Sequence, residues 1–525
     1  MKIRFPVVVI FGCLLALSIT FRLYQFAQLT EWWGDPGGDM LVARNILYNG
    51  HRPLVGPYLM VANFYTPPTY YYLLTFFLWA TKTPLGVTFV FFILNLSSGI
   101  LLAYLAKRLI DTTTGILTFF LYTFSSVMII HSHSIYQPYP IQLFLVLSLY
   151  LLWEALSQHR LLLLVGSLFS FSIAASIYPS PWLLAPYVIF SVRSFFQNSS
   201  LGKAKQYSLI RAVLLTGLIA VPIYLPQFLF EARERFPTFT VLVSHIGGFP
   251  DAAGVLRMYA IYTYQLFNQF FGIESFVKPP YAYGVGMAII SVFILMLTSV
   301  RRVAGALPPD KAKLYNRALA FINITWVLLS MITMIVFWEN AYHRLWVFFP
   351  IVFLLSSFCF RLALDTRLTW YRFCVGLIFC LYIIGNISAT RTWITRTDTN
   401  DFAKTEDAVR YIITDVKTQK ISDYNYGVLY YTTYGYGNYN LGAVLYFLQK
   451  DAGYPVRFLK AGNDIDRYGI NTSTFGTVYL ICRYFPNINA SHERCRNKFL
   501  EWNPRYVLRR FVVLPLGDLY IFTRE

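Results

Sequence analysis

The chain has 525 residues, of which 56% are hydrophobic, 18% aromatic and only 13% charged. A single water-soluble core cannot bury that much apolar surface, so lipid must be the solvent for most of the chain. The formal net charge is +19, but the basic residues lie in short clusters between apolar segments. This distribution favours a membrane-topology signal and argues against nucleic-acid binding.

The N-terminal segment carries Lys2 and Arg4 ahead of an apolar run over residues 5–19, the layout of a signal peptide or a signal anchor. No small-residue cleavage site follows it, so we interpret it as a retained membrane helix. With this run included, about eleven apolar segments are long enough to cross a bilayer. They cover residues 5–20, 85–106, 114–130, 141–156, 161–177, 182–191, 209–229, 285–300, 318–338, 345–360 and 373–388.

The orientation follows from the lysines and arginines of the short connecting loops, all of which fall on the same side as the N-terminus. They are Lys107, Arg108, Arg160, Arg193, Lys203, Lys205, Arg211, Arg301, Arg302, Lys311, Lys313, Arg317, Arg361, Arg367 and Arg372. We therefore expect a multi-pass protein of the bacterial inner membrane with a cytoplasmic N-terminus. An odd number of spans places everything after residue 388 outside the cytoplasm.

Three extracytoplasmic regions result: a first loop over 24–84, a loop over 230–283, and the C-terminal segment. We divide the chain into a membrane domain, 1–395, and a C-terminal domain, 396–525. The latter combines an amphipathic helix over 403–416 with strand-like runs at 426–431, 477–482 and 519–523, which predicts a small α/β domain. Cys482 and Cys495 lie together in this domain, where an oxidising compartment favours a disulfide between them.

The first outer loop contains the residues that point to chemistry. Residues 31–53 read EWWGDPGGDMLVARNILYNGHRP, and residues 63–72 read NFYTPPTYYY. Asp39 follows a glycine pair and opens a short amphipathic helix that Asn49 and Gly50 close. A carboxylate in this place can cap the helix or act on a substrate, and the pattern alone leaves both roles open.

This pattern resembles the first extracytoplasmic loop of the GT-C membrane glycosyltransferases related to bacterial protein O-mannosyltransferases and to the lipid A aminoarabinose transferase. In that family an acidic pair precedes a helix, a glycine turn and a Pro-Pro-x-Tyr-Tyr helix, which Asp39, the turn at 49–50 and residues 67–72 match. Residues 131–138 and 339–350 agree in layout with two further family segments. Met40 stands where the family has a second acid and Thr66 where a lysine often precedes the prolines, and both departures weaken a metal or phosphate role there.

The resemblance implies a GT-C fold and an inverting transfer of a sugar from a polyprenyl phosphate to a lipid, glycan or protein acceptor outside the cytoplasm. Attack at the anomeric carbon needs a base for the acceptor and a cation for the departing phosphate. We assign Asp39 as the base. For the donor phosphate we expect His343, Arg344 and Lys278, and for other substrate contacts Asp35, Arg44, Tyr71, His133, Gln137 and Glu339.

No cofactor is expected, and a divalent metal is disfavoured. His131 and His133 are two residues apart and so do not share a helical face, and no cysteine or further histidine is spaced to complete a tetrahedral site. Outer aromatic residues such as Trp32, Tyr58 and Tyr65 suit sugar stacking or an interfacial aromatic belt.

Two other functions stay open. A transporter or flippase of lipid-linked saccharides would need charged residues buried in the middle of its spans. A non-catalytic assembly partner would tolerate replacement of Asp39.

Overall fold

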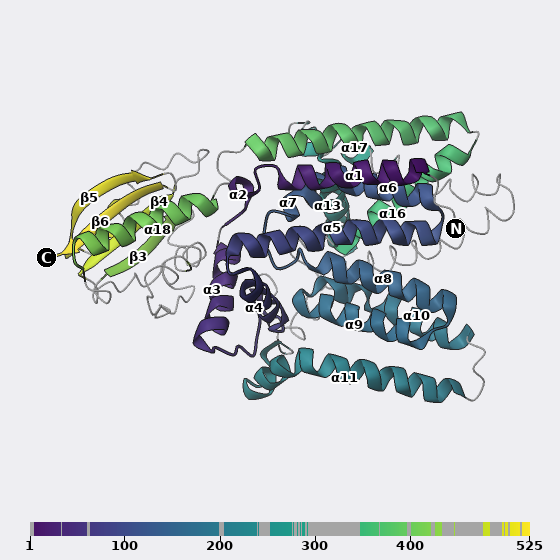
Figure 1. The fold of residues 1–525 in the computed structure, drawn as a ribbon, viewed down its shortest axis with the longest axis horizontal. Coiled ribbons are helices and arrows are strands. Elements are labelled where there is room, and N and C mark those ends of the chain that lie inside the picture. Colours follow the sequence, from purple (N-terminus) through teal and green to yellow (C-terminus); the bar gives the residue numbers. More distant parts are fainter. Residues whose placement is uncertain are drawn as a thin grey trace.

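The chain folds into a bundle of helices with a small sheet domain beyond one end (Figure 1). The computed structural model describes residues 5–32, 34–59, 64–198, 204–238, 240, 252–275, 277, 281, 284, 286–288, 291, 347–366, 368–395, 401–421, 426–432, 446, 476–483, 496–497, 499–501, 504–514 and 517–525.

The bundle consists mainly of long apolar helices. Its described helices are α1 (Phe5–Leu23), α5 (Pro84–Leu109), α6 (Thr112–Phe124), α7 (Ser126–His131), α8 (Ile141–Gln158), α9 (Leu161–Ile177), η1 (Ser180–Leu184), α10 (Ala185–Asn198), α11 (Ala204–Arg233), α13 (Ala252–Phe271), η2 (Ile273–Ser275), α16 (Phe349–Asp365) and α17 (Thr369–Thr395). Among the described residues, four helices are long and apolar enough to cross a membrane, namely α1, α5, α8 and α17. This makes the chain a membrane protein, whereas the expected number of eleven spans is not confirmed.

Two differences from the expected spans have visible causes. The segments 285–300 and 318–338 lie mostly or wholly outside the described residues. The segment 114–130 is divided at Ser125, whose extended backbone separates α6 from α7.

Side chains of other helices bind the backbone groups that this break releases. Arg22 of α1 is fully buried and donates from Nη2 to the carbonyl of Tyr122 at 3.1 Å. Asn386 of α17 accepts from the amide of Ser126 at 2.7 Å. Unpaired backbone groups are costly in a bundle surrounded by lipid. These contacts therefore stabilise the packing of α1 and α17 beside the break between α6 and α7.

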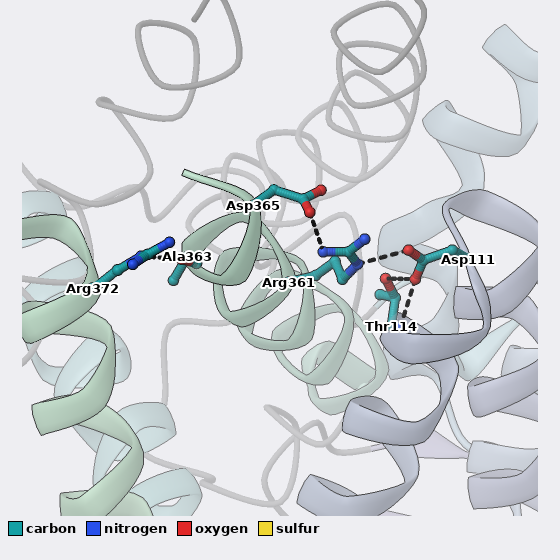
Figure 2. Close-up of polar contacts among 6 residues, drawn as sticks. All are labelled: Asp111, Thr114, Arg361, Ala363, Asp365 and Arg372. Carbon is teal, nitrogen blue, oxygen red and sulfur yellow. Dashed lines mark hydrogen bonds and ion pairs between the residues drawn. The ribbon is translucent and has the colours of Figure 1, made fainter. Parts of the chain in front are cut away.

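The start of α6 and the end of α16 lie at the end of the bundle away from the sheet domain (Figure 1), and ion pairs join them (Figure 2). The Arg361 guanidinium contacts Asp111 Oδ2 through Nε and Asp365 Oδ1 through Nη1, each at 2.6 Å. Asp111 also accepts a hydrogen bond of 2.8 Å from the amide of Thr114 and thereby caps α6. The pairs tie the start of α6 to the end of α16.

The opposite end carries the region that the sequence assigns to the first outer loop. It forms α2 (Phe26–Leu29), α3 (Gly34–Asn49), a short hairpin of β1 (Tyr58–Leu59) and β2 (Phe64–Tyr65), and α4 (Thr69–Thr81). Gly50, with φ of 67°, ends α3 in the left-handed conformation, as expected for the closing turn. Figure 1 shows α3 and α4 at the end of the bundle that faces the sheet domain.

The segment 230–283, expected as a second outer loop, contains the 20-residue helix α13. The end of α13 packs among the bundle helices, since the carbonyl of Phe270 accepts from Asn386 Nδ2 at 2.9 Å. This part of the chain is therefore partly built into the bundle.

The C-terminal domain has α18 (Asp401–Thr418) beside a four-stranded sheet of β3 (Tyr426–Thr432), β4 (Thr477–Arg483), β5 (Tyr506–Leu514) and β6 (Gly517–Arg524). The strand order is β3-β4-β6-β5, and only the β3–β4 pair is parallel. The expected helix and three strands are confirmed. The sequence did not predict β5, because Arg509 and Arg510 interrupt its apolar alternation and a bulge shifts its register at this point.

Candidate active site

Asp39 lies on α3 with 8% of its surface exposed. Met40 and Ala43, on the inner face of the same helix, are completely buried, so the apolar face fixes the rotation of α3. The hydroxyl of Thr75 on α4 donates to the carbonyl of Ala43 at 3.4 Å. In this arrangement the hydroxyl of Tyr71 on α4 donates a hydrogen bond to the Asp39 carboxylate.

The surroundings of Asp39 favour its protonated form. Burial raises the pKa of Asp39 well above its ordinary value, and the charge of Asp35 raises it further. The hydrogen bond from Tyr71 acts in the opposite direction and lowers this pKa. A carboxylate with a raised pKa is a stronger base than an exposed one, which suits proton abstraction near neutral pH.

Asp35, and not residue 40, is the second acid of this site. Asp35 lies four residues before Asp39 on α3, so the two carboxylates share one face of the helix. Met40 instead belongs to a buried apolar cluster with Tyr70 and Leu74. Met40 is therefore a core residue of this region.

Two expected substrate residues of the segment 131–138 are held by contacts within the protein. Gln137 donates from Nε2 to Thr66 Oγ1 at 3.2 Å and to the carbonyl of Ile177 at 2.5 Å. The ring of His133 is buried beside Trp393, at a centroid distance of 4.8 Å, and burial lowers the pKa of His133 to about 4. These contacts position the segment 131–138. In the described structure, neither Gln137 nor His133 is hydrogen-bonded to Asp39.

The segment 131–138 is also attached directly to the site, because the hydroxyl of Tyr70 donates to the carbonyl of Ile135. Thr66, which stands where a lysine often precedes the prolines in the resembled family, is buried and accepts the hydrogen bond from Gln137. Its carbonyl accepts from the amide of Gly56 at 2.6 Å, and a Cβ at Gly56 would lie 2.2 Å from the carbonyl oxygen of Pro67. Gly56 and Thr66 are therefore closely packed, which requires a glycine at position 56.

The remaining expected residue on α3, Arg44, contacts aromatic rings. Its guanidinium carbon lies 4.8 Å from the ring centroid of Tyr48 and 5.9 Å from that of Tyr446. The second ring comes from the C-terminal domain. Tyr446 was not predicted as a functional residue, and no local motif marks it.

Trp32 is not placed for stacking on a sugar. It is 1% exposed and lies edge-on to Phe402 and Tyr446, with ring centroids at 5.3 and 5.4 Å. Of the two roles left open for Trp32, sugar stacking is therefore excluded, because Phe402 and Tyr446 of the C-terminal domain cover its ring.

Four expected substrate residues lie outside the described residues, namely Lys278, Glu339, His343 and Arg344. Cys482 is buried in β4 and forms a disulfide bond. Cys495 also lies outside the described residues, so its pairing with Cys482 stays a prediction. Within the described part of the chain, no three His, Cys, Asp or Glu side chains are grouped as a metal site.

The fold and the site together define a GT-C membrane protein. The structure of ArnT from Cupriavidus metallidurans bound to undecaprenyl phosphate superposes with a TM-score of 0.56 at 11% sequence identity. The superposition covers 98% of this chain and 97% of ArnT. ArnT is the lipid A aminoarabinose transferase, and its fold is GT-C. The chain therefore has the fold that the resemblance in its first loop implied.

Two further solved structures are similar at lower scores. The oligosaccharyltransferase AglB from Archaeoglobus fulgidus, in complex with an inhibitory peptide and a dolichol-phosphate, has 12% identity and a TM-score of 0.46, covering 98% of this chain and 74% of AglB. ArnT in the apo state has 13% identity and a TM-score of 0.41, covering 98% and 97%. The fold assignment rests on the first structure. No protein-family model and no curated protein sequence matches the chain.

Proposed function

We propose that the chain is a glycosyltransferase that moves a sugar from a polyprenyl phosphate to an acceptor on the extracytoplasmic side of the membrane. The main support for this proposal is Asp39, a buried carboxylate with a raised pKa. It lies on a helix at the end of the bundle that faces the sheet domain, in a chain with a GT-C fold. ArnT, which shares this fold, is bound to undecaprenyl phosphate in its structure, and this supports a donor of that class.

The reaction needs a single displacement. The Asp39 carboxylate takes the proton of an acceptor hydroxyl as its oxygen attacks the anomeric carbon of the donor sugar. The bond between that carbon and the phosphate oxygen breaks, and the polyprenyl phosphate leaves with the electron pair. One displacement inverts the anomeric centre. Tyr71 holds the carboxylate in place through its hydroxyl, which keeps its proton because burial and Asp39 raise the pKa of Tyr71.

We assign the donor phosphate to His343 and Arg344, with Lys278 as a further cation, and substrate contacts to Asp35, Arg44, Tyr71 and Glu339. A guanidinium suits a phosphate that gains charge as it leaves, because it forms paired charged hydrogen bonds. Arg344→Ala is expected to weaken donor use by roughly 1.5–3 kcal/mol, or about 10- to 150-fold in kcat/KM, with Arg344→Lys recovering part. Unchanged donor kinetics in Arg344→Ala would contradict this assignment.

The topology proposal places the N-terminus in the cytoplasm and the C-terminal domain outside. The ion pairs of Arg361 and Arg108 lie at the end of the bundle opposite the sheet domain, which agrees with basic residues on the cytoplasmic side. Labelling of single cysteines introduced into the loops of intact cells would test the orientation. Labelling of Arg361→Cys from outside would contradict it.

The decisive experiment offers polyprenyl phosphate sugars and candidate acceptors to the purified full chain in lipid nanodiscs. Release of free polyprenyl phosphate is measured, and the anomer of the product is determined by nuclear magnetic resonance. Sugar transfer with an inverted anomer supports the proposal. A flippase would move the donor across a vesicle membrane without releasing polyprenyl phosphate. An assembly partner would neither move the donor nor release polyprenyl phosphate.

A further inference from the structure

The C-terminal domain contacts one residue before Asp39 in the chain and one residue after it. Trp32, just before α3, lies against Phe402 of α18 and against Tyr446. Arg44, beyond Asp39 on α3, lies under the ring of the same Tyr446. One tyrosine therefore contacts the residues that bracket the carboxylate, twelve positions apart in the sequence.

The contact belongs to a buried apolar cluster that joins the two parts of the molecule. Met40 and Ala43 of α3 share this cluster with Ala408 and Ile412 of α18. Tyr446 is 1% exposed within it. Because α3 is a short helix outside the long membrane helices, its position depends on such neighbours.

On its other side α3 is held by α4, through the hydrogen bonds of Thr75 and Tyr71. The carboxylate of Asp39 thus lies on a helix clamped between α4 and the C-terminal domain. A displacement of this helix by about 1 Å would take the base out of reach of its proton, a misplacement that can cost roughly 100-fold in rate.

We infer that Tyr446 is a positioning residue through which the C-terminal domain holds the Asp39 helix in its reactive place. The inference deepens the proposed function and rests on it for its catalytic consequence. The ring supplies the contact: it meets Trp32 edge-on at 5.4 Å and covers the Arg44 guanidinium at 5.9 Å. The domain is then a structural part of the active site.

The test compares Tyr446→Ala and Tyr446→Leu, which remove the ring, with Tyr446→Phe, which keeps it. Phe499→Leu is the matched control: Phe499 is fully buried on the opposite face of the sheet, against Phe522, so this variant disturbs the domain core away from α3. Hydrogen exchange of the α3 amides and the pH profile of sugar transfer are measured on the full chain in nanodiscs.

We expect faster α3 exchange and a fall in kcat of about tenfold or more in Tyr446→Ala and Tyr446→Leu, with near-native behaviour in the two other variants. Loss of the clamp admits water to Asp39, so the acid limb of the pH profile moves to lower pH. Native α3 exchange in both ring-removal variants, or an equal change in Phe499→Leu, would overturn the inference. If the native chain transfers no sugar, the proposed function fails, while the exchange data still decide whether Tyr446 holds α3.

Discussion

Two aspartates at opposite ends of the bundle show how the same side chain is used in two ways. Asp111 caps α6 and pairs with Arg361 at 2.6 Å, so its charge is neutralised by a fixed guanidinium. Asp39 is more deeply buried, and its described neighbours are the hydroxyl of Tyr71 and a second acid, Asp35. The ion pair of Asp111 holds two helices together. The carboxylate of Asp39, which lies beside a hydroxyl and another acid, remains able to take a proton.

The largest expected effect separates the two aspartates directly. Asp39→Asn removes the base and changes little shape, so we expect sugar transfer to fall by about 100-fold or more with folding and membrane insertion intact. Phosphate release measures the rate, and thermal unfolding in detergent checks the fold. Near-native turnover would show that Asp39 is not the base.

The next effect concerns stability at the opposite end. Arg361→Ala removes the guanidinium that contacts Asp111 and Asp365, and since these side chains are 35% and 13% exposed, we expect a loss of about 2 kcal/mol in unfolding free energy. Arg361→Lys is the milder companion variant. The turnover of the folded fraction is expected to stay native. A stable Arg361→Ala protein with reduced turnover would reverse the roles given to the two ends.

A smaller effect tests the hydrogen bond to the base. Tyr71 donates to the ionised carboxylate, so Tyr71→Phe raises the pKa of Asp39 further, and a higher pH is needed to ionise it. The acid limb of the kcat profile is therefore expected to move to higher pH, with a loss of about 1 kcal/mol, or roughly fivefold in rate, at neutral pH. A profile that moves the other way would contradict the donor role of Tyr71.

The smallest expected effect has the opposite sign. The charge of Asp35 raises the pKa of Asp39, so Asp35→Asn lowers it and lets Asp39 ionise at lower pH. The acid limb of the kcat profile is expected to move to lower pH, measured beside Tyr71→Phe under the same conditions. If Asp35→Asn and Tyr71→Phe both move the acid limb in the same direction, the acid limb does not reflect the ionisation of Asp39.

The local features of the site could be predicted from the sequence. The closing turn at Gly50 and the prolines before α4 are short-range patterns that fix helix ends wherever they occur. The same applies to α18 and to three of the four strands, whose periodicities are regular. The expectation that Asp39 opens its helix was wrong, because α3 already begins at Gly34 and includes the glycine pair. β5 was missed because two arginines and a bulge break its alternation.

The partners of the site residues could not be predicted. Gln137 and His133 were expected at the substrate, but their contacts to Thr66, Ile177 and Trp393 come from distant segments. For Trp32, sugar stacking and an interfacial belt were both left open, because nothing in its neighbourhood indicates that a tyrosine more than 400 positions later covers it.

By itself the sequence determined that the chain is a membrane protein, and that Asp39 lies on a helix of the first outer loop that ends at Gly50. These properties follow from composition, apolar length and backbone capping, which act over a few residues. Only the tertiary structure decided that Tyr71 and Tyr446 lie beside that helix and that, among the described residues, Asp111 contacts a guanidinium while Asp39 accepts from the hydroxyl of Tyr71. Burial and charge at a carboxylate are set by neighbours in space, and the sequence order does not specify which ones meet.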